Sequence, residues 1–243
     1  MYIKSLSTIF LLLVIHSLPG TTSSKTLDQK QKEHEMLFAN YQLVDLSHSL
    51  NSGVPTWDGS CGFHLKMKCD YTDCESETKF RIHRVEMNAG IGTHLDAPHH
   101  CFSEGTSIDQ LSLSHLMVPA AVIDIASKAH ANYLLSVEDI HDFEIKHGKI
   151  PPDHLIIIYT GWSSYWPDSN RYRNLDVQGL MHFPSISAEA AQYLVDHQAV
   201  GIAIDTLSPD LPSTDYPVHR LVLGCGTYII ENVANAHLLP PYG

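Results

Sequence analysis

The stretch His154–Trp162 reads HLIIIYTGW, and Ala199–Thr206 reads AVGIAIDT. Near-continuous apolar runs of this kind are typical of β-strands that are buried on both faces, as in the interior of an α/β sheet. Each run ends in a polar or glycine-containing turn. Because sites tend to form just past the ends of such strands, we predict that Trp162 and Asp205 lie near a substrate pocket.

The remaining strand candidates are rich in Val, Ile and Tyr, and they cover residues 41–50, 79–87, 120–126 and 227–233. Helices are expected over residues 136–148 and 187–198. A serine begins each of these two segments, in the position where it can cap the first turn. Strands interleaved with a few helices indicate an α/β fold with a single mixed-sheet domain over residues 41–243.

The chain has 243 residues and a formal net charge of −12, from 27 acidic and 15 basic side chains. Nucleic acids and anionic membrane surfaces require clustered Lys and Arg, so the composition argues against both as partners. A small-molecule substrate is expected instead. The apolar fraction of 44% is that of an ordinary globular protein.

The first residues have the pattern of a signal peptide over residues 1–23, with a lysine, an apolar run, a Pro-Gly pair and small residues. A retained anchor is the alternative, although the run is short for a membrane span. Residues 24–40 are charged and lack an apolar stripe, which predicts a mobile or helical N-terminal arm. We therefore expect a secreted protein, or one in the lumen of the secretory pathway.

The chain contains five cysteines, so at least one is unpaired or intermolecular if the others form disulfides. Cys69 and Cys74 lie close enough in sequence to form a bridge. A zinc ribbon is the competing interpretation, but the spacing lacks the two CxxC pairs of such a site.

The segment Asn88–Cys101, NAGIGTHLDAPHHC, crowds histidines around a carboxylate. His94 and Asp96 are two residues apart, so on an extended segment both point to the same side, as two ligands of one cation require. His100 follows across a proline that can turn the chain back toward them. The alternative is a plain polar loop with solvated histidines.

A second region, residues 215–233, contains His219 and Glu231. Glu231 interrupts an apolar strand, where burial of an unpaired carboxylate costs free energy that a cation would offset. In the alternative interpretation Glu231 faces solvent on an edge strand.

Residues 92–100, GTHLDAPHH, match the GTHxDxPxH part of the HxGTHxDxPxH signature of the metal-dependent cyclase-like hydrolase family. Residues 44–59, 201–210 and 217–233 resemble further family segments in the same order. The resemblance implies the swivelling β/β/α fold of that family. It also implies that His94, Asp96, Glu231 and His219 bind metal.

The same resemblance implies that His100 transfers protons and that Trp57 borders the substrate. If His219 is not a direct ligand, it is suited to a catalytic role, in which it orients the water or stabilises the oxyanion. One position departs from the signature, because Gly90 stands where the family has a histidine that helps to hold a second metal. We therefore expect one divalent metal ion, manganese or zinc. Substitution of the missing ligand by His83 or His99 is the alternative.

The expected function is a secreted metal-dependent amidohydrolase that uses metal-activated water to cleave the C–N bond of an N-acyl or cyclic amide. An arylformamide or isatin-like substrate is favoured, because Trp57, Phe102 and Trp162 can form flat apolar walls, although core packing explains each equally well. Family relatives assemble as homo-oligomers, so a dimer or higher form is expected.

The alternative function is a catalytically silent secreted protein that binds metal or ligand on the same fold. A thiol nucleophile at Cys101 is disfavoured, because neighbours on an extended segment point to opposite sides and Cys101 would not share a site with His100.

Overall fold

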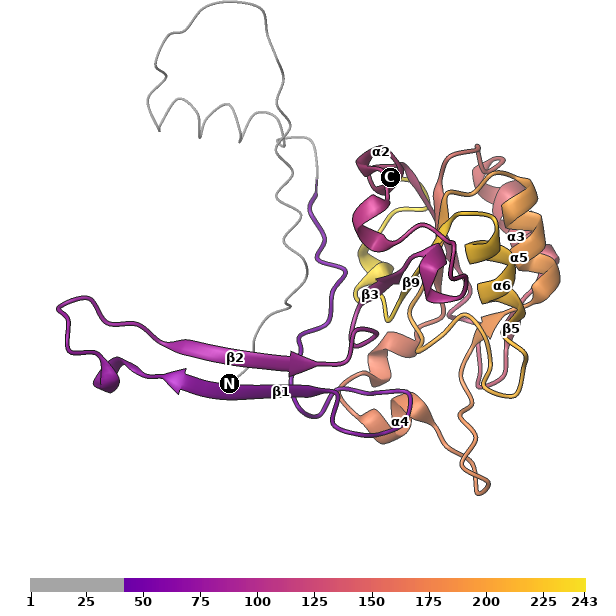
Figure 1. Cartoon of the computed structure of the whole chain (residues 1–243). Helices are drawn as coiled ribbons and strands as arrows, with labels where there is room; N and C mark the ends of the chain where they lie inside the picture. The colour runs from indigo at the N-terminus through magenta and orange to yellow at the C-terminus, as the bar shows by residue number, and fades with distance from the viewer. Residues whose placement is uncertain (1–41) are drawn as a thin grey trace, which may run out of the picture.

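The computed structural model describes residues 42–243. Its centre is a five-stranded sheet with the order β3-β9-β8-β6-β4 (Figure 1). The strands are β3 (His94–Asp96), β4 (Ala120–Asp124), β6 (Leu155–Tyr159), β8 (Gly201–Ile204) and β9 (Tyr228–Glu231). Pairing is parallel from β4 to β9, and β3 runs antiparallel to β9. The predicted buried strands and the mixed sheet are therefore confirmed.

Three helices cover one face of this sheet, as Figure 1 shows: α3 (Val137–His147), α5 (Ala188–Asp196) and α6 (Pro217–Gly224). The largest hydrophobic cluster lies between these helices and the sheet, with alternate isoleucines of the parallel strands at its centre. The predicted caps are confirmed, since the hydroxyls of Ser136 and Ser187 accept hydrogen bonds from the first turns of α3 and α5. Such caps satisfy amide groups that the helix itself leaves unpaired.

The opposite face of the sheet carries a smaller apolar cluster that contains Val122, Ile157 and Ala203. Val233 and Ala236, which follow β9, pack onto it. Residues in successive positions along β4, β6 and β8 thus face different cores, which explains why these strands read as continuous apolar runs.

The shorter elements lie mostly in the connections. They are α2 (Leu113–Leu116), α4 (Ser169–Arg173), β5 (Leu134–Leu135), β7 (Ser185–Ile186) and the 3-10 helices η1 (Tyr71–Asp73), η2 (Pro98–His100), η3 (Ile108–Gln110), η4 (Trp162–Tyr165) and η5 (Ala236–Leu238). Strands β5 and β7 pair in parallel as a separate two-stranded sheet.

A long β-hairpin projects from the body (Figure 1) and consists of β1 (Phe63–Cys69) and β2 (Ile82–Met87). The two strands pair antiparallel with each other, and with no other strand within residues 42–243. Phe63 anchors the hairpin at the body, where it is buried against Leu50 and Ile91. The expected strand at residues 79–87 is β2, whereas its partner β1 was not expected. We call β1, β2 and the connection between them the arm.

The predicted strand at residues 41–50 is wrong for the residues that the structure describes. Residues 42–49 form no ladder, although the carbonyl of Leu46 accepts a hydrogen bond of 2.8 Å from the amide of Ala234. Residues 42–49 therefore lie beside the sheet as irregular chain, although their composition is typical of a strand. The predicted signal peptide (1–23) and N-terminal arm (24–40) lie outside the described residues. Within residues 42–243, no helix is both long and apolar enough to cross a membrane.

Candidate metal centre

The antiparallel pair β3–β9 brings three side chains that could bind a metal ion to one face of the sheet edge. His94 pairs directly with Glu231, and Asp96 lies two residues further along β3 on the same side as His94. The Nε2 atom of His94 lies 3.4 Å from Oε2 of Glu231 and 3.6 Å from Oδ1 of Asp96. The backbone hydrogen bonds fix the register of β3 against β9. This register brings Glu231 next to His94 and Asp96, although it lies far from them in the sequence.

The charge balance of this cluster requires a positive partner. Asp96 and Glu231 are both only 7% exposed. Burial raises the pKa of Glu231, against the hydrogen bond from His219 and the attraction of His94, which lower it. The Nδ1 atom of His94 donates to the carbonyl of Gly92 at 2.9 Å, so Nε2 is the ring nitrogen directed at the carboxylates. A cation at this point would offset the cost of burying both carboxylates.

The spacing of the donor atoms fits a divalent ion. Single donor atoms of His94, Asp96 and Glu231 all lie within 4.8 Å of one another. Two tetrahedral ligands with bonds of about 2.1 Å are separated by about 3.4 Å. The distances of 3.4 and 3.6 Å from Nε2 of His94 therefore need little adjustment to accommodate such an ion.

His219 enters the same region from the first turn of α6, and a carboxylate that the sequence analysis missed holds it there. Asp210 is 2% exposed and accepts hydrogen bonds from the amides of Val218 and His219. The same carboxylate lies 2.7 Å from Nδ1 of His219. Asp210 therefore both caps the helix and fixes the imidazole orientation, with Nε2 of His219 directed at Glu231, 3.5 Å away.

The two carboxylates dominate the protonation of His219. Burial acts to lower its pKa, but the hydrogen bonds to Asp210 and Glu231 outweigh burial and raise the pKa to about 9. In the absence of a metal, a proton on His219 thus supplies part of the positive charge that the buried carboxylates need.

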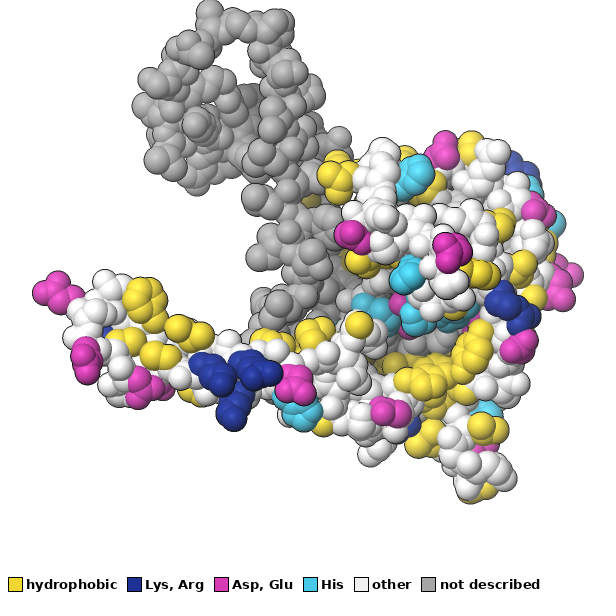
Figure 2. All heavy atoms as spheres, viewed as in Figure 1, with side chains coloured by type: hydrophobic (Ala, Val, Ile, Leu, Met, Phe, Trp, Pro, Cys, Tyr) yellow, Lys and Arg dark blue, Asp and Glu magenta, His cyan; other side chains and the backbone are white. Residues whose placement is uncertain are grey.

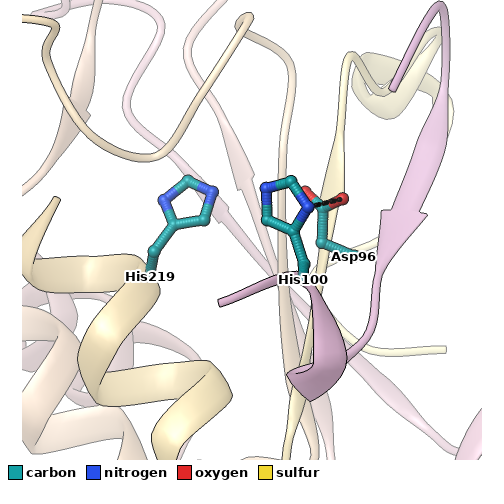
Figure 3. Close-up of side chains that lie close together, drawn as sticks. All are labelled: Asp96, His100 and His219. Carbon is teal, nitrogen blue, oxygen red and sulfur yellow. Dashed lines mark ion pairs between the residues drawn. The ribbon is translucent and has the colours of Figure 1, made fainter. Parts of the chain in front are cut away.

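His100 lies between Asp96 and His219, as Figure 3 shows. It ends η2, and its Nδ1 atom is 3.9 Å from Oδ1 of Asp96. The ring centroids of His100 and His219 are 6.0 Å apart. The His100 side chain is 56% exposed, so it contacts both the cluster and the solvent. This position agrees with the expectation that the proline turns His100 back toward Asp96.

Gly90 lies directly beside the imidazole of His94. A Cβ atom at this position would lie 3.2 Å from Nε2 of His94, so a longer side chain there would reach the ligand cluster. His83 and His99 do not take this position: His83 is on β2 opposite Met67, and His99 is exposed on η2. Neither belongs to the groups of donor atoms that converge in the described part of the chain.

Partly exposed aromatic rings lie next to His219. The ring of Tyr216 is 6.0 Å from that of His219, and Trp57 is 6.3 Å from Tyr216. Phe102 lies against α6 at Gly224. Trp57, Tyr216 and Phe102 are 39%, 40% and 37% exposed, which leaves part of each ring free. Histidines gather on this side of the body beside a patch of hydrophobic side chains (Figure 2). Tyr216 was not expected from the sequence.

Trp162 and Asp205 occupy structural positions, in contrast to the expectation that they contact substrate. Trp162 packs in a buried cluster, and its indole donates to the carbonyl of Tyr172 at 2.8 Å. Asp205 is 0% exposed, and its carboxylate accepts hydrogen bonds from Thr160 and from the amide of Ser163. Both follow buried strands as expected, but their polar groups are already used within the core.

Cys101 is not suited to act as a nucleophile. Partial burial raises the pKa of its thiol, and the nearby carboxylates of Asp96 and Asp210 raise it further. A reactive thiol requires the opposite environment, in which positive charge stabilises the thiolate.

Known proteins with similar sequences identify the family. The family model described as putative cyclase matches residues 44–211. The chain belongs to this cyclase family. The match includes β3 and η2 and ends before α6 and β9.

Curated relatives agree with the assignment. The chain is 29% identical over 164 residues to isatin hydrolase of Roseibium aggregatum, a match that covers 63% of this chain and 62% of that protein. It thus spans less than two thirds of the length of that relative. The chain is 26% identical over 198 residues to kynurenine formamidase of Geobacillus thermodenitrificans, which covers 81% of this chain and 84% of that protein.

Solved structures confirm the cyclase-family fold. Isatin hydrolase A from Ralstonia solanacearum has a TM-score of 0.78 at 24% identity, with 92% of this chain and 90% of that chain covered. Isatin hydrolase A from Labrenzia aggregata, bound to benzyl benzoate, has a TM-score of 0.77 at 26% identity, with 89% and 90% covered.

Proposed function

We propose that this cyclase-family protein is a metal-dependent hydrolase that cleaves the C–N bond of a small N-acyl or cyclic amide. The observation that carries the proposal is the convergence of His94, Asp96 and Glu231, with His100 between this cluster and the solvent. The similarity to proteins named isatin hydrolase and kynurenine formamidase supports the reaction type.

The residues of the cluster would hold one divalent ion, manganese or zinc. Imidazole and carboxylate ligands suit either metal, and the cluster contains no thiolate that would select a softer ion. When bound, the ion supplies a Lewis acid that polarises the amide carbonyl and makes water a nucleophile at neutral pH. Gly90 supports a single ion, because no side chain extends from this position toward His94.

His100 is the proposed proton carrier. An imidazole can both accept and release a proton near neutral pH. From its place beside Asp96, His100 would accept the proton of the attacking water and deliver it to the leaving nitrogen. Its exposure allows the proton to be exchanged with solvent after each turnover.

His219 is the proposed second functional histidine, and Asp210 is its positioning residue. The 2.7 Å contact between Asp210 and Nδ1 keeps a proton on that nitrogen and leaves Nε2 to act toward Glu231. There Nε2 would ligate the ion or donate a hydrogen bond to the carbonyl oxygen as it gains negative charge. Asp210 serves both alternatives by fixing the ring.

The substrate class follows from the aromatic rings near His219. Trp57, Tyr216 and Phe102 each keep an exposed part, and flat apolar surfaces of this kind suit an aromatic substrate. An arylformamide and an isatin-like cyclic amide both fulfil this requirement. We therefore assign both to the substrate class of this protein.

Secretion and self-association are further parts of the proposal. The signal-peptide pattern of residues 1–23 supports export. Apolar side chains along the arm support a homo-oligomer, since Met67, Phe80 and Ile82 are 42%, 56% and 53% exposed.

The test is a substrate panel with purified protein that has been stripped of metal and reloaded with manganese or zinc. The panel contains isatin, an arylformamide, and an aliphatic formamide as the matched control for the aromatic ring. We expect metal-dependent hydrolysis of at least one aromatic amide and much weaker hydrolysis of the aliphatic one. Metal binding without turnover of any amide would instead identify a silent binding protein and contradict the proposal.

A further inference from the structure

Two cysteines at the far end of the arm face each other. The Sγ atoms of Cys69 and Cys74 are 3.8 Å apart, and both side chains are half-buried. Cys61, Cys101 and Cys225 are exposed, and within residues 42–243 none of them has a sulfur contact with another cysteine. The Cys69–Cys74 pair is therefore distinct among the five cysteines of the chain.

The local structure holds this pair together. Cys69 ends β1, and Cys74 follows the single turn of η1. Asp70 caps that turn, and its carboxylate also forms an ion pair of 2.8 Å with Arg81 on the returning chain. The Arg81 guanidinium lies over the ring of Tyr71, 4.7 Å from its centroid. These contacts fold the segment between the cysteines into a turn, so the thiols meet without a long-range constraint.

The backbone around the two sulfurs is also suited to a bridge. The carbonyls of Asp70 and Phe80 lie within 4.0 Å of both sulfurs, and the amide of Phe80 donates to Cys74 at 3.3 Å. Both sulfurs thus occupy one shared site instead of pointing to opposite sides of the turn. A disulfide requires a sulfur separation of about 2.05 Å, which small side-chain rotations from such a start can reach.

We propose that Cys69 and Cys74 are a redox modification site that forms a reversible disulfide across the tip of the arm. The oxidant is a small-molecule disulfide such as oxidised glutathione. The contact with Cys74, burial and the carboxylates of Asp73 and Asp70 raise the pKa of the Cys69 thiol, so Cys74 is the first attacker. The Cys74 thiolate attacks a sulfur of oxidised glutathione and releases one reduced glutathione, and the Cys69 thiolate then displaces the other. The two cysteines lose two electrons and two protons, which the two reduced glutathione molecules carry away.

The bridge stabilises the hairpin that projects from the body. A two-stranded hairpin on its own is marginally stable, and in the described part of the chain β1 and β2 pair with no other strand. The disulfide closes the segment 69–74 covalently and limits the conformations available to an opened tip. We expect it to protect the arm from proteolysis, with little effect on the distant metal centre.

Mass spectrometry tests the proposal directly, because trypsin cleaves after Lys68 and Lys79 and releases both cysteines in one peptide, residues 69–79. The purified full chain is equilibrated with oxidised glutathione, denatured, alkylated without reductant and digested. We expect the peptide to lack alkyl groups and to be lighter by about 2 Da than its reduced form. Reduction with dithiothreitol before alkylation should add two alkyl groups.

Matched variants complete the experiment. Cys69→Ser should leave Cys74 either free for alkylation or in a mixed disulfide with glutathione, with no bridge inside the peptide, whereas Cys61→Ser should leave the oxidised peptide unchanged. In the native protein, limited digestion of the arm should be several-fold slower for the oxidised form than for the reduced form. A peptide that carries two alkyl groups after the oxidation step, a bridge to Cys61, or equal digestion rates would overturn the proposal.

Discussion

The strand pair β3–β9 and the short helix η2 contribute to the same site in different ways. His94, Asp96 and Glu231 project from paired backbone, and both carboxylates are 7% exposed. His100 projects from a single turn of 3-10 helix, and its side chain is 56% exposed. A metal ligand must keep its position within a few tenths of an ångström, whereas a proton carrier must reach both the reaction and the solvent.

This difference predicts that substitutions in the two regions have separable effects. Changes on the strands should remove metal and activity together, and changes on η2 should remove activity alone.

Glu231→Gln should cause the largest loss. The amide preserves the size of the side chain but replaces a charged ligand with a neutral one among His94 and Asp96. We expect metal affinity to fall by about 100-fold or more, and hydrolysis to become undetectable. Metal titration followed by calorimetry, together with the amide assay, measures both. Glu189→Gln, at an exposed carboxylate, is the matched control. Equal metal affinity in the two variants would show that Glu231 is not a metal ligand.

His100→Ala should retain the metal and lose most of the turnover. Because the strands supply the buried ligands, we expect metal affinity to change little, while kcat falls by about 10²- to 10⁴-fold. The exposed neighbour His99→Ala is the control and should keep normal activity. Loss of metal from the His100 variant would show that η2 belongs to the ligand set, against the division described above.

Asp210→Asn should have an intermediate effect that identifies its positioning role. Asparagine can retain the oxygen that accepts from the amide of Val218, but its NH2 group then replaces the oxygen that accepts from the amide and from Nδ1 of His219. We expect a loss of about 10- to 100-fold in metal affinity or kcat without a matching rise in KM. Asp215→Asn, at an exposed carboxylate next to α6, serves as the control. Unchanged metal affinity and unchanged kcat in Asp210→Asn would exclude the positioning role.

Gly90→His should extend the strand-side ligand set. The new imidazole would lie beside Nε2 of His94, where a Cβ atom would lie 3.2 Å away. We expect several-fold tighter metal binding or a second bound ion, measured by elemental analysis at saturating metal. Gly90→Ala controls for the added Cβ atom. If Gly90→His and Gly90→Ala bind metal identically, the imidazole at residue 90 does not reach the metal site.

The smallest expected effect concerns the stability of metal-free protein. The pKa of His219 is about 9 in the folded chain and about 6.5 when unfolded, so the folded state binds this proton more tightly. This contribution to stability is complete below pH 6.5 and is lost as pH rises through 9. Thermal unfolding in the presence of a chelator should show a Tm that falls by a few degrees over this window.

The control for the pH experiment is Asp210→Asn, which removes one of the two carboxylates that raise the pKa of His219. Its Tm should depend less on pH between 6.5 and 9. A wild-type Tm that rises with pH in this window would contradict the assigned charge balance.

Elements with strong local signals could be predicted from the sequence. The apolar runs at β6 and β8 became buried strands, and the serine caps of α3 and α5 are in place. The order of the strands in the sheet, and the register that places His94 opposite Glu231, come from long-range pairing that the local pattern does not contain.

Residue type, spacing and the family resemblance together grouped five residues into one expected site. His94, Asp96, His100, His219 and Glu231 do lie together. Asp210 was missed because it acts on a helix that begins seven residues later, through backbone amides that carry no sequence signal. Trp162 and Asp205 do follow buried strands, but their partners in the core, Tyr172 and Thr160, could not be foreseen.

The most direct measurement is anomalous X-ray diffraction from crystals loaded with manganese or zinc, recorded at the absorption edge of the metal. Our account predicts one peak per chain, within ligand distance of Nε2 of His94 and of the carboxylates of Asp96 and Glu231. Crystals of Glu231→Gln grown under the same conditions should lack this peak. A peak elsewhere in the chain, or none in wild-type crystals at saturating metal, would contradict the account.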